Sequence, residues 1–262
     1  MPNISRSLLQ GSTSLMLYKG FETSDHTTIS GDISLWQTVQ VPQAYLAYQW
    51  PLRLSVVSSD ARYLAVAGRR GLAHYSVGSG RWKTFEDSIA ENSFTVRGGM
   101  CWWQHILVAA VESGNSYEVR LYSREKTLAN SQVLHSEILP YPVVCMATSG
   151  EDSLLVYTYE NVLLHYIFVS SSKTVRLAQV GQIAFHGIIR APPRVRAISW
   201  ILPEEQRDNG DPSHDVATAS VLFLVDAKLV LLQPSANEHG ELKYDMRVIA
   251  HNVEFYTLSR EQ

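Results

Sequence analysis

The sequence has few cysteines, little net charge and no long apolar run. Only Cys101 and Cys145 occur, each inside apolar sequence, which excludes a disulfide framework and favours a reduced intracellular compartment. The formal net charge of −3 lacks the basic excess of proteins that neutralise nucleic-acid phosphates, so nucleic acid is not a predicted partner. No apolar run approaches the roughly 18 residues that span a bilayer, and the N-terminus lacks the basic and apolar regions of a signal peptide. These absences predict a soluble cytosolic protein.

Catalytic and metal-binding motifs are missing as well. The chain contains no nucleophile elbow, no His-Glu-x-x-His helix, no paired Cys-x-x-Cys ligands and no dinucleotide fingerprint. We therefore predict no catalytic residue, no cofactor and no metal. An enzyme built on this chain would need carboxylates on the strands around a central channel. The candidate strands offer only Arg53, Arg97 and Arg196, which could instead bind an anion or an acidic partner tail.

The chain is rich in signals for β-structure. Short runs of β-branched and aromatic residues alternate with turn signals, which predicts an all-β protein. Tyr75, Tyr122 and Tyr166 recur in the second strands of expected hairpins at intervals of roughly 45 residues. Four strands in each such unit are typical of WD-repeat-like β-propeller blades. Four hairpin turns are expected, at Arg69-Arg70, Glu112 to Ser116, Glu160-Asn161 and Asp226 to Lys228.

The repeat divides the chain into units. Residues 36–262 are predicted to hold about four blades of four antiparallel strands, at roughly 52–90, 91–140, 141–190 and 191–250. Residues 1–35 are predicted to be the end of a preceding blade or poorly ordered. The polar stretch 202–215 is predicted to be a surface loop between the first two strands of the last unit. The expected architecture is a partial propeller, and the sequence leaves open whether it closes.

The stretch Gly68-Arg69-Arg70-Gly71 could be a phosphate cradle or a turn. A phosphate cradle needs a glycine loop that opens onto a helix N-terminus and ends in Gly-Lys-Ser/Thr. Here the glycines are followed by Leu-Ala-His-Tyr-Ser-Val, which alternates with the period of a strand. The pattern predicts a hairpin turn, in which glycine adopts backbone angles that other residues disfavour.

Alternate turns of a propeller fall on opposite ends of the disc, so the four hairpin turns are expected to share one face. That face mixes a basic pair with acidic turns, so it does not form a funnel of one charge sign. Arg69 and Arg70 are the preferred candidates for a partner contact, and the alternative that they are simply solvated turn residues stays open. The candidate partner-contact residues are Arg69, Arg70, Glu160, Asn161 and Lys228.

Two further features are predicted to serve packing. Adjacent residues of a strand point to opposite faces, so Trp102 and Trp103 are expected to divide between the two sides of one blade. His74 and His165 precede two of the recurring tyrosines at matching positions. This match indicates a repeated packing role for the two histidines rather than a metal site.

Five segments carry a resemblance to a known family: "YQWPLRLSVVSSDARYLAVAGRRGLAHYSVGSGRWKTF", "VRGGMCWWQHILVAAVE", "YEVRLYSREKTLANSQV", "SLLVYTYENVLLH" and "NVEFYTLSR". From about Trp36 to the C-terminus the chain resembles the Ric family. The large WD-repeat subunit of that family joins a smaller arrestin-like subunit, Rgp, in a Golgi guanine-nucleotide exchange complex. Three motifs follow one another in the first of these segments: a Trp-Pro pair, a Gly-x-Ala-His-Tyr-Ser strand and a closing Trp-Lys pair. This order is more specific than general WD-repeat patterning.

The resemblance implies a non-catalytic scaffold segment of an exchange factor for a Rab/Ypt GTPase in retrograde endosome-to-Golgi and intra-Golgi transport. The expected partners are an Rgp-type subunit, the GTPase and, through the complex, the Golgi membrane. The expected location is therefore cytoplasmic and peripheral on Golgi membranes. Because Ric proteins are several times longer, the chain is expected to be a fragment without exchange activity alone. The alternative is a generic WD-repeat peptide-binding module outside membrane traffic.

Overall fold

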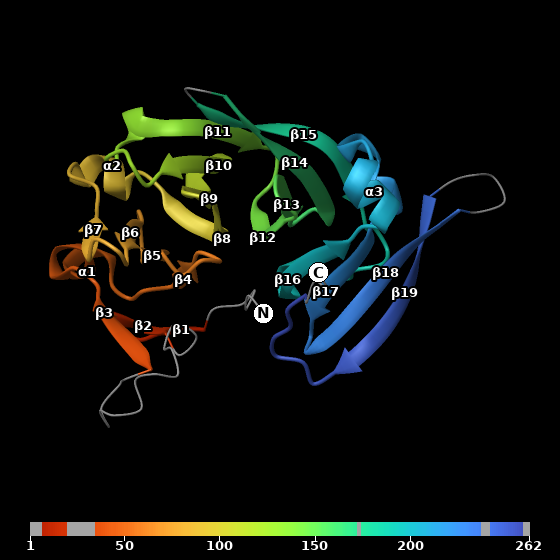
Figure 1. Cartoon of the computed structure of the whole chain (residues 1–262), viewed down its shortest axis with the longest axis horizontal. Coiled ribbons are helices and arrows are strands. Elements are labelled where there is room, and N and C mark those ends of the chain that lie inside the picture. Colours follow the sequence, from red (N-terminus) through yellow and green to blue (C-terminus); the bar gives the residue numbers. More distant parts are fainter. Residues whose placement is uncertain (1–6, 20–34, 172–173, 237–241, 259–262) are drawn as a thin grey trace, which may run out of the picture.

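A computed structural model describes residues 7–19, 35–171, 174–236 and 242–258 of the chain. These residues form five antiparallel sheets that follow one another around a common centre (Figure 1). The first sheet is three-stranded and contains β1 (Leu8–Gln10), β2 (Ser14–Tyr18) and β3 (Trp36–Gln40). The other four sheets have four strands each: β4 (Leu54–Val57), β5 (Tyr63–Ala67), β6 (Ala73–Ser76) and β7 (Arg81–Lys83); β8 (Thr95–Trp103), β9 (Ile106–Ser113), β10 (Ser116–Ser123) and β11 (Val133–Leu139); β12 (Val143–Ser149), β13 (Ser153–Thr158), β14 (Val162–Ser170) and β15 (Val175–Ala184); and β16 (Val195–Ile201), β17 (Ser220–Val225), β18 (Lys228–Ala236) and β19 (Leu242–His251).

The strand order in each four-stranded sheet follows the sequence, so each sheet is an up-and-down meander. The first strands β4, β8, β12 and β16 contact one another in succession and lie toward the centre, whereas β7, β11, β15 and β19 lie at the rim (Figure 1). This is the arrangement of β-propeller blades. The prediction of an all-β chain with propeller blades of four antiparallel strands is confirmed. The blades trace an open arc, with a gap between the β1–β3 sheet and the β16–β19 sheet (Figure 1).

The apolar core lies between neighbouring sheets. Four clusters of buried side chains fill the four interfaces between the five sheets. A middle strand of an internal blade is covered on both faces and can be apolar without alternation, and all six residues of β13 are buried. By contrast β19, at the end of the arc, exposes Met246, Val248 and Ile249.

The two adjacent tryptophans of β8 divide as expected. The Trp102 ring lies 5.3 Å from the ring of Tyr63 on one neighbouring blade. The Trp103 ring lies 4.3 Å from the ring of Phe168 on the other. The alternation of a strand was therefore enough to predict that each indole serves a different blade interface.

The two matching histidines also pack between blades. His74 on β6 makes an edge contact with Trp102, and His165 on β14 makes an edge contact with Trp200. Both imidazoles are buried. The predicted packing role is confirmed, because in each case the histidine contacts a tryptophan from the first strand of the following blade.

Short helices occupy connections between strands. They are α1 (Gln43–Gln49), α2 (Ser88–Asn92), η2 (Asn130–Gln132), η3 (Pro192–Arg194), α3 (Glu204–Asn209), η4 (Pro212–His214) and α4 (Asp215–Thr218).

The predicted loop 202–215 does lie between the first two strands of its blade, but much of it is helical. The Asp211 carboxylate accepts a hydrogen bond from the Ser213 amide at 2.9 Å, which caps η4. Glu204 and Glu205 favour the first turn of α3 because that end of a helix attracts negative charge.

The first sheet crosses the predicted unit boundary at residue 36. Trp36–Gln40 pairs with β2, and β2 pairs with β1. Residues 1–6 and 20–34 of the predicted N-terminal unit lie outside the described residues. The described parts of residues 7–40 therefore belong to one sheet, which contacts β4 through β1.

Candidate interaction surface

The hairpin turns and the connections between blades share one face of the arc. In a four-stranded meander, the turn after the second strand lies on the same side as the connection to the next blade. This face carries the β5–β6, β9–β10, β13–β14 and β17–β18 turns together with α1 and α2. Residues 68–71 lie in the β5–β6 turn and lead into a strand, so the prediction of a hairpin turn is confirmed.

The β5–β6 turn is held in place by α1. The Tyr45 hydroxyl accepts a hydrogen bond from the Gly68 amide at 2.9 Å and donates one to the Arg70 carbonyl at 3.3 Å. The Gln49 carbonyl accepts from the Arg69 amide at 2.8 Å, and its side-chain Oε1 accepts from the Arg70 amide at 3.0 Å. Tyr45 and Gln49 are buried, so buried partners fix the backbone of both arginines.

Gln49 also joins the turn to α2. Its Nε2 donates to Glu91 Oε2 at 2.9 Å and to Asn92 Oδ1 at 3.2 Å. Burial raises the pKa of Glu91, and the hydrogen bond from Gln49 opposes that shift. At the surface, Arg70 Nη1 donates to the Asn92 carbonyl at 2.8 Å, which orients the guanidinium beside α2. One buried glutamine therefore couples α1, the arginine turn and α2.

The segments that this glutamine joins carry exposed side chains. Tyr48 and Trp50 flank it in sequence and are 76% and 56% exposed, and Ile89 on α2 is 80% exposed. Arg69 and Arg70 are also exposed. We refer to these five residues as the Arg69/Arg70 surface. Tryptophan, tyrosine and arginine are the side chains that dominate interface hot spots, so this composition favours partner binding.

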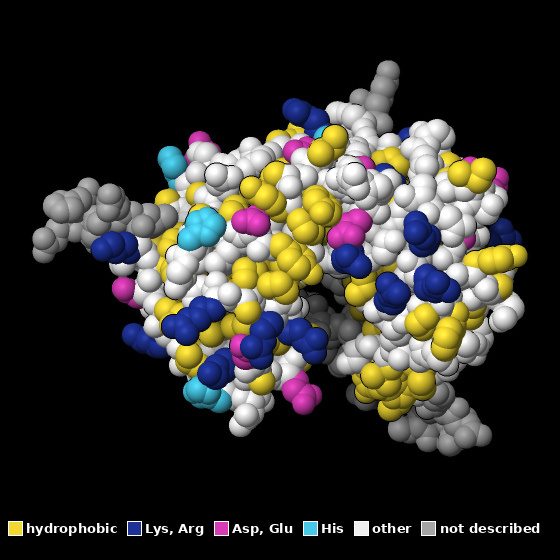
Figure 2. Space-filling view, turned by 180° about the vertical axis from the view of Figure 1, so that it is seen from behind, with side chains coloured by type: hydrophobic (Ala, Val, Ile, Leu, Met, Phe, Trp, Pro, Cys, Tyr) yellow, Lys and Arg dark blue, Asp and Glu magenta, His cyan; other side chains and the backbone are white. Residues whose placement is uncertain are grey.

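The face of the molecule drawn in Figure 2 exposes basic and hydrophobic side chains together. Lys and Arg side chains gather on both sides of the central opening, and hydrophobic side chains are exposed between them and at their edges (Figure 2). Acidic side chains occur on the same face (Figure 2). On the face seen in Figure 2, side chains of both charge signs therefore occur together.

Gly68→Ala is expected to lower the free energy of unfolding by about 3 kcal/mol. A Cβ atom at this position would clash with the Gln49 carbonyl oxygen, so α1 or the turn would have to move. Gly78→Ala in the β6–β7 turn is the matched control, because a Cβ there would meet nothing within 4 Å. Its expected effect is below about 0.5 kcal/mol. Urea unfolding followed by far-UV circular dichroism measures both variants, and equal losses would contradict the close approach of α1.

The other predicted contact residues do not join the Arg69/Arg70 surface. Glu160, in the β13–β14 turn, and Lys228, at the start of β18, are both exposed. They belong to different blades from Arg69 and Arg70. The structure therefore places these candidates on separate parts of the face and does not gather them into one site.

The prediction of Asn161 as a contact residue is corrected. Asn161 is buried, and its Oδ1 accepts a hydrogen bond from the Tyr157 hydroxyl at 2.6 Å. Its Nδ2 donates to the carbonyls of Phe185 and Ile189 at 2.7 and 2.9 Å. Its φ of 62° is the left-handed conformation that asparagine tolerates. Because both ends of the amide are used inside the protein, Asn161 stabilises the turn.

Sequence reasoning did not single out Tyr48, Trp50 or Ile89. The helices that carry or adjoin them have seven and five residues, too few for a periodic hydrophobic pattern to be recognised. The one available signal was Asp87, whose carboxylate accepts from the Ile89 amide at 2.9 Å as an N-cap of α2. The exposure of the three side chains depends on tertiary packing.

The rest of the described chain gives no sign of a metal site, a reactive thiol or a membrane-spanning helix. Among the described residues, no group of three or more His, Cys, Asp or Glu side chains could hold a metal ion. Burial raises the pKa of Cys101 and of Cys145 to about 12, so neither is a reactive thiolate at neutral pH. No helix in the described ranges is both long enough and apolar enough to cross a membrane.

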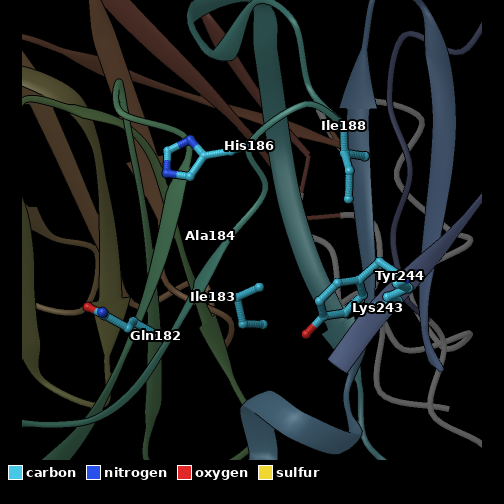
Figure 3. A pocket seen from close by; sticks show the side chains of 7 residues that line it. All are labelled: Gln182, Ile183, Ala184, His186, Ile188, Lys243 and Tyr244. Carbon is cyan, nitrogen blue, oxygen red and sulfur yellow. The ribbon is translucent and has the colours of Figure 1, made fainter. Parts of the chain in front are cut away.

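A groove of about 420 Å³ lies at the rim between β15 and β19 (Figure 3). Tyr244 points across it toward Ile183 (Figure 3). The Tyr244 hydroxyl is already committed, since it donates to the Val216 carbonyl at 3.0 Å. With few polar groups aimed into it, this groove is a weaker candidate than the Arg69/Arg70 surface. Its lining residues are Gln182, Ile183, Ala184, His186, Ile188, Lys243 and Tyr244.

The fold and the exposed surface define a WD40-like β-propeller. The β-propeller domain of Cps50 (Swd1) from Myceliophteria thermophila matches 92% of this chain and 68% of its own chain with a TM-score of 0.53. At 9% sequence identity this likeness shows the fold alone. The family model described as the RIC1 second beta propeller domain matches residues 11–262. The chain belongs to this family.

Curated relatives agree with the family model. The guanine nucleotide exchange factor subunit ric1 of Schizosaccharomyces pombe is 31% identical over 254 residues, which is 97% of this chain and 24% of the relative. The guanine nucleotide exchange factor subunit R06F6.8 of Caenorhabditis elegans is 33% identical over 84% of this chain and 15% of its own length. The mouse subunit RIC1 is 35% identical over 43% of this chain and 8% of its own length. The chain thus spans a quarter or less of the length of these relatives.

Proposed function

We propose that the chain is a non-catalytic β-propeller scaffold of the large subunit of a Rab GTPase exchange complex. The observation that carries this proposal is the match to the RIC1 second beta propeller domain over residues 11–262. Relatives that align with this chain are named guanine nucleotide exchange factor subunits. The proposed setting is retrograde endosome-to-Golgi and intra-Golgi vesicle transport, with the protein in the cytoplasm and peripherally on Golgi membranes.

The proposed direct partner is a smaller, arrestin-like Rgp-type subunit, and the proposed GTPase is the Golgi Rab/Ypt protein that the complex activates. Exchange requires no covalent chemistry, because a factor that binds the nucleotide-free GTPase more tightly than the loaded form accelerates GDP release. The Arg69/Arg70 surface supports a binding role, since exposed aromatic and arginine side chains stand on a backbone fixed by buried Tyr45 and Gln49.

The isolated chain is expected to co-elute with the Rgp-type subunit on size exclusion and to leave the rate of GDP release unchanged. A blade segment can provide a binding surface without the remaining parts that engage the GTPase. Release of a fluorescent GDP analogue from the Rab GTPase measures the second expectation. The complex of the complete large subunit with the smaller subunit serves as the positive control.

Two results would contradict this proposal. Accelerated GDP release by the chain alone would show that it is an exchange module and not a scaffold. A chain that is folded by circular dichroism but elutes apart from both the subunit and the GTPase would favour a peptide-binding module outside membrane traffic.

A further inference from the structure

We infer that the Arg69/Arg70 surface binds an acidic segment of a partner protein that also carries an apolar side chain as an anchor. The inference rests on the proposed role of the chain in a multisubunit complex and adds the chemistry of the segment that docks. Four properties of the surface lead to it: positive charge without an ion-pair partner, a fixed backbone, exposed apolar side chains on the segments that hold the turn, and carboxylates next to α2 in sequence.

The positive charge is uncompensated. In the part of the chain that the structure describes, neither Arg69 nor Arg70 forms an ion pair. Arg70 donates from Nη1 to the Asn92 carbonyl, which leaves other guanidinium N–H groups for a ligand. The nearby Glu91 is buried and accepts from Gln49. Carboxylates are the natural complement, because guanidinium groups bind them through two parallel hydrogen bonds.

The backbone that presents the two arginines is fixed before any partner arrives. The amides of Arg69 and Arg70 donate to Gln49, and the Arg70 carbonyl accepts from Tyr45. A rigid binding element loses less conformational entropy on association than a mobile loop. The turn is therefore better suited to a specific contact than two solvated arginines on a flexible loop.

Exposed apolar side chains are carried by the segments that hold the arginine turn. Tyr48 and Trp50 lie on either side of Gln49 in sequence, and Gln49 hydrogen-bonds both to the arginine turn and to α2, which carries Ile89. All three side chains are more than half exposed. Burial of such groups by a partner supplies affinity that charge pairing alone does not, so the complementary segment needs an apolar anchor beside its acidic residues.

Carboxylates next to the surface favour a protein over a lipid bilayer. Glu86 and Asp87, immediately before α2, are exposed, and an anionic membrane plane would repel them. Two arginines are also few for membrane attachment, since each basic residue near an anionic bilayer contributes only about 1 kcal/mol. A discrete acidic segment can pair with the arginines and avoid these carboxylates.

The test compares the wild-type chain with Arg69→Glu/Arg70→Glu in binding to the purified Rgp-type subunit by biolayer interferometry. The double variant is expected to weaken binding by at least about 30-fold, and raising the salt concentration is expected to weaken the wild type more than the variant. Tyr48→Ala removes an exposed side chain without a buried role and is expected to weaken binding by about 5-fold. Unfolding midpoints in urea confirm that each variant is folded.

The matched control is Arg62→Glu/Arg81→Glu, an equal change of charge at exposed arginines on the opposite face of the same blade. Its binding is expected to equal that of the wild type. Equal losses in the two double variants, or no loss in either, would overturn the inference and leave the proposed scaffold role intact. A wild-type chain that fails to bind the subunit would overturn the inference, and failure to bind the GTPase as well would overturn the proposed scaffold role. Arginine-dependent binding to phosphatidylcholine–phosphatidylserine vesicles, with subunit binding unchanged, would assign the surface to lipid and overturn the protein partner.

Discussion

Trp103→Ala is expected to lower the free energy of unfolding by about 4 kcal/mol. Trp103, at the end of β8, is buried and stacks on Phe168 of β14 with ring centroids 4.3 Å apart and planes inclined by 11°. Its Nε1 also donates to the Glu151 carbonyl at 2.6 Å. Alanine would leave a cavity between two blades, because the sheets cannot close the space without breaking their other contacts.

Trp50→Ala is the matched control for that substitution. Trp50 is 56% exposed, so the same change is expected to alter the free energy of unfolding by less than about 1 kcal/mol. Far-UV circular dichroism in urea measures both variants without depending on tryptophan fluorescence. A loss at Trp103 no larger than the loss at Trp50 would show that the stacked indole does not hold the two blades together.

Lowering the pH from about 7 to about 5 is expected to reduce the free energy of unfolding by about 4 kcal/mol through His74 and His165 together. Burial lowers the pKa of each imidazole from 6.5 to about 4, and at His74 the charges of Lys83 and Arg124 lower it further. Asp215 Oδ2 lies 3.9 Å from His165 Nε2. Because the His165 imidazole is neutral at pH 7, this contact is not an ion pair there.

The direction of the change follows from proton binding. The unfolded chain protonates these histidines near pH 6.5, whereas the folded protein protonates them only near pH 4. Stability that is fully present above the unfolded pKa is therefore lost as the pH falls between these two values. Burial raises the pKa of Glu91 and of Asp215, and these carboxyl groups oppose the loss at the acidic end of the window.

A variant isolates the histidine contribution. His74→Leu is expected to remove about 2 kcal/mol of the difference in unfolding free energy between the two pH values. His186→Gln, at an exposed position, is expected to keep the wild-type difference. Urea unfolding at both pH values measures each variant. A His74→Leu protein with the full wild-type difference would show that other groups cause the acid sensitivity.

Much of the blade architecture could be predicted from local sequence. β-Branched and aromatic runs between turn residues predicted the hairpins, because strand periodicity and turn chemistry act over a few residues. The strand that follows Gly71 excluded a phosphate cradle. Alternation along β8 predicted that Trp102 and Trp103 serve different interfaces, and the structure agrees.

The candidate surface could be predicted only in part. Arg69 and Arg70 are exposed, as expected for turn residues. Asn161 in the equivalent turn of another blade is buried, and its side chain donates hydrogen bonds to the carbonyls of Phe185 and Ile189. The sequence also indicated only part of the reason why glycine occupies positions 68 and 71 of the β5–β6 turn. Gly71 has the positive φ that was anticipated, whereas Gly68 is required by the close approach of the Gln49 carbonyl.

The sequence by itself determined the β-hairpins, their repeat and the turn that carries the two arginines, since these depend on neighbouring residues. Only the tertiary structure decided which turns receive support from another segment. Gln49 meets Arg70, Glu91 and Asn92 across long separations in the chain, and no local pattern encodes such contacts. That buried glutamine brings two short helices and one turn together, and their packing leaves Tyr48, Trp50 and Ile89 exposed and fixes the backbone of the two arginines.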